Sequence, residues 1–136
     1  MRVEGGCYCG AIRYEAEGEP MMKAECFCRE CQYITGGSNV LAMAMPIEGF
    51  ALTKGTVKGF ARDDIEHAVT REFCGNCGTH LFTRAPGFAH GVIIKVGSLD
   101  DPSVFGKAES ANYVCDAQPF HRLPADMPLN QKWMHS

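Results

Sequence analysis

Short apolar runs, separated by glycine, proline and polar residues, predict a chain built mostly of strands. Residues 12–16 alternate between apolar and polar side chains, which is typical of a half-buried strand. Residues 40–45 form a continuous apolar run that ends at Pro46, which predicts a strand buried on both faces. Fifteen glycines spread along the chain are consistent with frequent turns.

Further apolar runs extend this pattern through the middle of the chain. Residues 50–53 and 57–61 flank the sequence KGT and predict a hairpin. Three more strands are expected, at residues 68–73, 81–84 and 91–96. Helical signals are confined to residues 29–34 and to a capped turn or short helix at 100–105, where Pro102 suits the first turn. The pattern predicts a mainly β protein of several short antiparallel sheets.

Composition narrows the class of protein. The chain has 136 residues, 46% hydrophobic and 21% charged, which fits one domain with an apolar core and excludes a disordered chain. The longest uncharged apolar stretch is far shorter than the roughly 20 residues that cross a bilayer. The first six residues include an acidic residue and no apolar run, so a secretory signal is not expected. A net charge of −3 with mixed signs argues against a partner such as nucleic acid or an anionic membrane.

Eight cysteines dominate the candidate chemistry. Without a secretory signal the expected location is cytoplasmic, where thiols stay reduced. Clustered cysteines in such a protein indicate metal ligands or catalytic groups more than disulfides. Seven of the eight fall into three clusters with short spacing: Cys7 and Cys9; Cys26, Cys28 and Cys31; Cys74 and Cys77.

The C-x-x-C-G turn at Cys74 and Cys77 is typical of a zinc knuckle, which supplies half of a tetrahedral site. Cys7 and Cys9 form the best second pair, because they also lie in a short turn ended by glycine. Closing the loop between the pairs costs about 4 kcal/mol plus a constant, against about 10–16 kcal/mol from structural zinc. We therefore predict that these four cysteines hold a structural zinc ion. The alternative is a redox pair at C-x-x-C, which usually opens a helix.

Cys26, Cys28 and Cys31 lie close enough in sequence to hold one ion by themselves. Three protein ligands with one open position is the arrangement of a catalytic zinc ion. A site with three thiolates suits sulfur chemistry, because it can hold a substrate thiolate. Two alternatives stay open. Cys115 could close the site as a fourth ligand, or some of the three could be buried thiols; Cys115 itself is expected to be half-buried. His80 is expected near a metal site or at the surface, not as a ligand.

Four sequence blocks resemble one known family. They are GCYCG at 6–10, CFCRECQ at 26–32, FCGNCGT at 73–79 and GSLDDP at 97–102. In this order, with seven cysteines in register, they are similar to the glutathione-dependent formaldehyde-activating enzyme (GFA) family, which includes the centromere protein V type. The resemblance covers about residues 5–120. Within it, Phe27, Gln32 and Phe120 stand where the family often has His, Arg and Trp.

The resemblance implies a β-tent fold, with small sheets pinned by zinc. It implies two zinc ions per chain, a structural one on Cys7, Cys9, Cys74 and Cys77 and a catalytic one on Cys26, Cys28 and Cys31. It also implies a lyase that makes and breaks the carbon–sulfur bond between formaldehyde and glutathione, giving S-(hydroxymethyl)glutathione.

We therefore expect a cytoplasmic carbon–sulfur lyase acting on a thiol such as glutathione and on an aldehyde or its S-hydroxymethyl adduct. The expected organisation is a single domain over residues 1–136, with a core of about 5–120 and a tail of 121–136. A homodimer is compatible with this reading. The alternatives are a non-enzymatic, zinc-stabilised module that binds a protein partner, and a thiol-based metal store or redox sensor.

Overall fold

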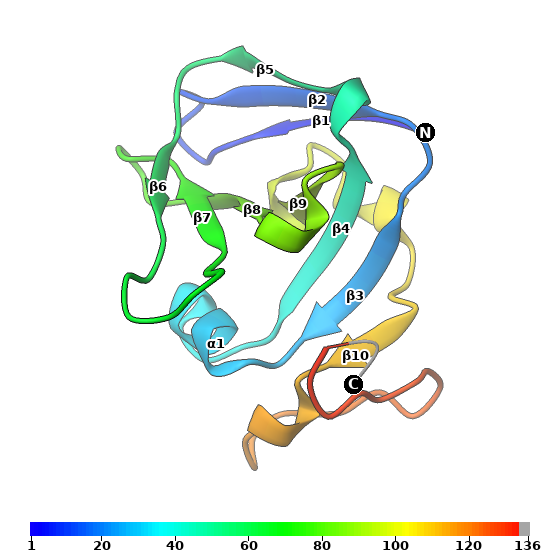
Figure 1. Ribbon diagram of the computed structural model, residues 1–136. Helices are drawn as coiled ribbons and strands as arrows, with labels where there is room; N and C mark the ends of the chain where they lie inside the picture. The colour runs from blue at the N-terminus through cyan, green and yellow to red at the C-terminus, as the bar shows by residue number, and fades with distance from the viewer. Residues whose placement is uncertain (134–136) are drawn as a thin grey trace.

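The computed structural model describes residues 1–133, and residues 134–136 at the end of the expected tail lie outside the described part. The chain forms a three-stranded and a seven-stranded sheet, and the smaller sheet lies across one end of the larger (Figure 1). The expected mainly β class is therefore confirmed. The described helices include none with the length and apolar character needed to cross a membrane.

The three-stranded sheet has the order β1-β2-β5, and both of its pairings are antiparallel. Its strands are β1 (Arg2–Gly6), β2 (Arg13–Glu17) and β5 (Phe50–Lys54). In β2 the side chains of Tyr14 and Ala16 are buried while their neighbours are more exposed, as the alternating pattern predicts.

The seven-stranded sheet has the order β10-β3-β4-β9-β8-β7-β6. Its strands are β10 (Ser110–Asn112), β3 (Met22–Cys26), β4 (Val40–Pro46), β9 (Gly91–Lys95), β8 (His80–Arg84), β7 (Thr70–Phe73) and β6 (Lys58–Phe60). The pairing of β10 with β3 is parallel, and the other pairings are antiparallel. The sequence pattern anticipates neither β3 nor β10 as a strand.

The hairpin expected between residues 50–53 and 57–61 does not form. Strand β5 pairs with β2, whereas β6 pairs with β7 in the other sheet. The chain passes from one sheet to the other at Gly55, whose φ is +76°. A Cβ at this position would lie 2.2 Å from the carbonyl oxygen of Ala11, so the turn packs closely on the neighbouring segment. The glycine therefore serves a crossover and not a tight hairpin.

The main core lies between the two sheets. The ring of Phe82 packs edge-on against both Tyr14 and Phe50, with centroids 4.9 Å apart in each pair. Met43 and Met45 of β4 are fully buried in the same core. Offset-stacked and edge-on aromatic contacts of this kind fix the distance between the sheets.

The opposite face of the large sheet carries a second, smaller core. Ala24, Ala42 and Ala44 provide a shallow surface there, and Cys31 packs against it. Helix α1 (Arg29–Thr35) supplies that cysteine, and Figure 1 shows α1 beside the ends of the central strands. Strand β4 is thus buried on both faces, as its continuous apolar run predicts.

Short 3₁₀ turns join the remaining elements. They are η1 (Ile47–Gly49), η2 (Pro86–Phe88), η3 (Val96–Ser98), η4 (Pro102–Phe105) and η5 (Val114–Asp116). The Asp101 side chain accepts a hydrogen bond from the backbone N–H of Ser103, which confirms the capped turn expected near Pro102.

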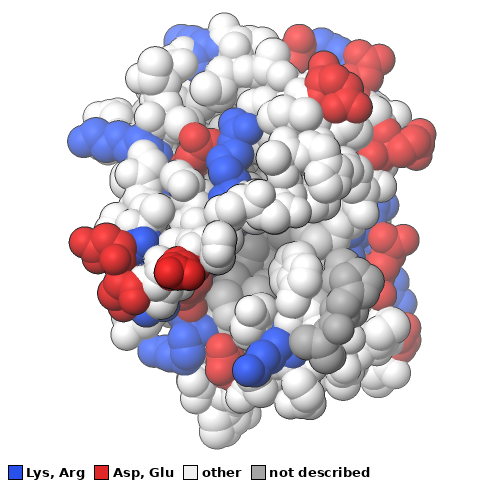
Figure 2. All heavy atoms as spheres, viewed as in Figure 1, with Lys and Arg blue, Asp and Glu red and all other residues white. Residues whose placement is uncertain are grey.

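The segment after β10 is tied to the sheet edge. The backbone N–H of Ala111 donates to the carbonyl of Pro128, and that of Tyr113 donates to the carbonyl of Lys132. These bonds cover an edge strand that would otherwise expose its backbone groups. On the face seen in Figure 2, acidic and basic side chains are interspersed.

Candidate metal centres

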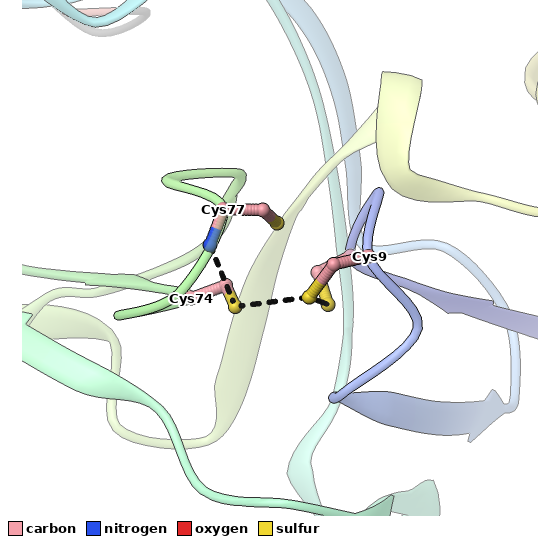
Figure 3. A group of neighbouring side chains, drawn as sticks. Cys9, Cys74 and Cys77 are labelled. Carbon is pink, nitrogen blue, oxygen red and sulfur yellow. Dashed lines mark hydrogen bonds between the residues drawn. The ribbon is translucent and has the colours of Figure 1, made fainter.

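Two turns bring the first cysteine cluster together. Cys7 and Cys9 follow β1, while Cys74 and Cys77 lie between β7 and β8. The four sulfur atoms lie within 4.8 Å of one another. In Figure 3, Cys9 faces Cys74 and Cys77 across the gap between the two turns. The cluster joins the small sheet to the large one.

The sulfur spacing in this cluster fits a tetrahedral zinc site. Zn–S bonds of about 2.3 Å at tetrahedral angles place neighbouring sulfurs about 3.8 Å apart. The Cys7 and Cys9 sulfurs are 3.6 Å apart, and those of Cys9 and Cys74 are 3.8 Å apart. These separations are far longer than the roughly 2.05 Å bond of a disulfide. The donor set and its spacing therefore fit zinc.

Backbone N–H groups surround the sulfurs and favour their ionised form. The N–H groups of Asn76 and Cys77 each point at the Cys74 sulfur from 3.4 Å. This knuckle requires Gly78, whose φ is +79°. The Thr79 hydroxyl lies 3.2 Å from the Cys77 sulfur, and this hydrogen bond is the main cause that lowers the pKa of Cys77 to about 5. A lowered thiol pKa favours metal binding because the ligand is the thiolate.

The second cluster is built at the start of α1. Cys26 ends β3, Cys28 is the N-cap of α1, and Cys31 lies in its first turn. The three sulfur atoms lie within 4.8 Å of one another. The Cys28 sulfur accepts a hydrogen bond from the backbone N–H of Cys31 at 3.3 Å, so the helix cap also orients a candidate ligand.

The three thiols form a coupled group. The Cys28 and Cys31 sulfurs are 3.0 Å apart, closer than the roughly 3.8 Å of a tetrahedral zinc site, so binding would spread them. Contacts with the Cys26 and Cys31 thiols lower the pKa of Cys28 to about 2. The contact with Cys28 raises the pKa of Cys26 to about 11, and the contacts with Cys26 and Cys28 raise that of Cys31. The ionisation of each thiol in this group therefore depends on the other two.

Cys115 stands apart from this cluster. It lies in η5, and its sulfur is 3.8 Å from a carboxylate oxygen of Asp116. Its side chain is exposed, so the expectation of a half-buried cysteine is wrong. Tyr113, the residue that precedes η5, adopts a left-handed backbone conformation with φ of +55°.

The sequence motifs assign no role to four side chains on the elements around the second cluster. Arg71 of β7 forms a 2.6 Å ion pair with Glu30 of α1. Lys95 of β9 donates a 2.6 Å hydrogen bond to Thr83 of β8. In the sequence, Lys95 is a charged residue within the apolar run at 91–96. Its position beside the second cluster depends on how its strand pairs with the neighbouring strands.

His80 begins β8 and is half-buried. Its ring stacks on Phe73 with centroids 5.3 Å apart. Burial lowers the pKa of His80, and the charges of Lys95 and Arg71 lower it further. It belongs to neither group of candidate ligands, as expected.

A concave region opens on the outer side of α1. It has a volume of about 510 Å³. Its lining comes from α1 and from the segment after η5: Arg29, Gln32, Tyr33, Gly36, Gly37, Gln118 and Phe120. Gln32 is buried and donates hydrogen bonds to the carbonyls of Phe27 and Asp116, both at 2.9 Å. The cavity therefore adjoins the helix that carries two of the three thiols.

The fold and its two thiol clusters define a small β protein with two candidate zinc centres. The chain belongs to the glutathione-dependent formaldehyde-activating enzyme family, whose sequence model matches residues 2–116. A crystal structure of a Rhodobacter sphaeroides protein has a similar fold, with a TM-score of 0.61 and 18% identity, covering 77% of this chain and 96% of that one. No curated protein matches the sequence.

Proposed function

We propose that this protein is a zinc-dependent carbon–sulfur lyase that joins a thiol such as glutathione to an aldehyde and cleaves the adduct. The observation that carries this proposal is the group of three thiols from β3 and α1, to which residues 1–133 add no fourth ligand. Closed structural zinc sites have four protein ligands, whereas catalytic sites keep an open position. Membership of the family supports the same chemistry.

Each cluster has a distinct task in this proposal. Cys7, Cys9, Cys74 and Cys77 hold a structural zinc ion that joins the two sheets. Cys26, Cys28 and Cys31 hold the catalytic ion, which when bound lets a substrate thiol ionise near neutral pH. The Arg71–Glu30 ion pair fixes α1 against β7 and so orients two of the three ligands.

The reaction needs no redox step. The thiol loses its proton, its sulfur forms a bond to the carbonyl carbon, and the π electron pair of C=O moves to oxygen. The oxygen then takes up one proton, so the adduct has the composition of thiol plus aldehyde. The reverse sequence breaks the carbon–sulfur bond. A cytoplasmic location and a single domain over residues 1–136 complete the proposal.

The test combines metal content with the rate of adduct exchange. Freshly purified protein should hold about two zinc ions per chain. It should also accelerate exchange between labelled formaldehyde and its glutathione adduct, measured by NMR because the uncatalysed reaction also proceeds. The C28S variant should stay folded, lose one zinc ion and lose the acceleration. The matched C115S variant should keep both ions and full activity, because Cys115 is exposed and outside the cluster.

Two results would overturn the proposal. One is a C28S variant with unchanged zinc content, which would place the second ion elsewhere. The other is wild-type protein that holds both ions but accelerates no exchange with glutathione or with smaller thiols.

The exposed rings of Tyr33 and Phe120 favour a second candidate function, a module that binds a protein partner. Their side chains are 80% and 69% exposed, and both line the cavity beside α1. Exposed aromatic residues that lie together are enriched at protein interfaces. The exchange assay separates the two functions, because a binding module would hold zinc without catalysing exchange.

A further inference from the structure

Lys95 lies on the same face of the large sheet as the three-thiol cluster. It pairs with Ala42 of β4, and Ala42 in turn pairs with Ala24 of β3. Residues that are directly opposite one another in neighbouring strands share a face. Ala24 and Ala42 pack with Cys31 on that face, so the side chain of Lys95 begins beside this group.

The ammonium group of Lys95 is buried without a carboxylate partner among residues 1–133. Only 8% of the residue is exposed, and its Nζ donates to the Thr83 hydroxyl at 2.6 Å. An ammonium has three N–H donors, so one hydroxyl leaves two of them for another acceptor. Burial of such a charge is unfavourable unless negative groups lie near it.

The groups that favour the charged form of Lys95 are the three thiols. Burial and the charge of Arg71 lower the pKa of Lys95 to about 8, although Cys31, Cys26 and Cys28 act to raise it. Arg71, the other cation on this face, is already paired with Glu30. Among residues 1–133, Lys95 is therefore a cation beside the cluster that keeps N–H donors for a ligand and has no carboxylate partner.

We propose that Lys95 binds the carbonyl oxygen of the aldehyde and stabilises the negative charge that this oxygen acquires when the carbon–sulfur bond forms. This inference rests on the proposed function. The electron pair that leaves the C=O π bond reaches an oxygen that faces the buried ammonium of Lys95, and such contacts are strongest away from bulk water. The oxygen gains one proton in the product, matching the proton that the thiol gives up.

Two small ligands distinguish a direct contact between Lys95 and the ligand oxygen from a general effect of the Lys95 charge on the metal centre. Thioacetate has the S–C–O arrangement of the adduct, whereas ethanethiol offers sulfur alone. Both bind as monoanions, so a charge that acts only on the metal centre affects both alike. We would follow their binding by absorption spectra of the full chain carrying cobalt in place of zinc. Each probe is compared with itself across variants, which removes their different intrinsic affinities.

The decisive variants replace Lys95, one with loss of its charge and one with the charge retained. K95M should weaken thioacetate binding by about 10- to 100-fold, the usual value of a hydrogen bond to a charged group, and ethanethiol binding by less than about threefold. K95R should keep most of the thioacetate affinity, because it retains the charge. The control K107M removes an exposed lysine and should change neither affinity.

Loss of affinity for both probes to the same extent in K95M would overturn the contact with oxygen while leaving the proposed function intact. A wild-type cobalt spectrum that ethanethiol does not alter would overturn both, because no position would be open for a thiolate. A lysine-to-methionine change in an apolar site is expected to be tolerated. If K95M does not fold, K95Q removes the same charge and is judged by the same ratio.

Discussion

The proposed structural zinc site gives the sharpest test of the fold, through the substitution C74S. Cys74 is 2% exposed and its sulfur receives the N–H groups of Asn76 and Cys77. Serine keeps the size of this side chain and can accept the same hydrogen bonds, so the variant removes a metal ligand and little else. Any large effect on stability therefore reports the metal.

The expected loss is comparable to the entire stability of the domain. Cys9 and Cys74 are separated by 65 residues, and closing such a loop costs about 4 kcal/mol plus a constant. A structural zinc ion contributes about 10–16 kcal/mol, whereas a typical domain is stable by only about 5–15 kcal/mol. We expect C74S to be largely unfolded without added zinc.

Urea unfolding followed by circular dichroism measures this loss, with metal content determined on the same samples. Wild-type protein treated with a strong chelator should lose its cooperative transition as C74S does. C115S provides the matched control and should unfold at the wild-type urea concentration. A C74S protein with an unchanged unfolding midpoint would refute the role of this cluster as a structural centre.

Three further predictions concern single side chains. Y14F removes the 2.7 Å hydrogen bond to Ser98 and should lower the free energy of unfolding by about 1 kcal/mol. Burial raises the pKa of Tyr14 to about 12, so the stability of the wild-type protein should fall between about pH 10 and 12 by up to about 1.4 kcal/mol per pH unit. The stability of Y14F should lack this pH-dependent loss. Q32L leaves the carbonyls of Phe27 and Asp116 unpaired and should cost about 2–3 kcal/mol in urea unfolding, so an unchanged midpoint would contradict the buried amide bonds. R13Q breaks an exposed ion pair with Asp100 and should cost less than about 1 kcal/mol, a difference that added salt should reduce.

Local spacing made much of the site predictable. Cys74 and Cys77 are held in one turn, so their convergence depends on a few backbone angles and on Gly78. Cys28 and Cys31 are brought together by one turn of α1. In each case the residues that shape the turn are neighbours in the chain, and the pattern can be recognised without knowledge of the rest of the fold.

The partners of each strand could not be predicted in this way. Residues 50–54 and 58–60 form strands near their expected positions, yet they join different sheets. An apolar run indicates that a strand is buried but not which strand lies beside it. The reason is that alternative neighbouring strands offer similar backbone hydrogen bonds. The parallel pairing of β10 with β3 likewise depends on chain segments more than 80 residues apart.

The sequence by itself determined the mainly β class, the buried strand β4 and the grouping of seven cysteines. Each of these features depends on residues that are close together along the chain. Only the tertiary structure decided that Lys95 lies beside the three-thiol cluster. Its neighbours Thr83, Ala42 and Cys31 come from three other elements, and a charge inside an apolar strand acquires a role only through the groups that long-range pairing places around it.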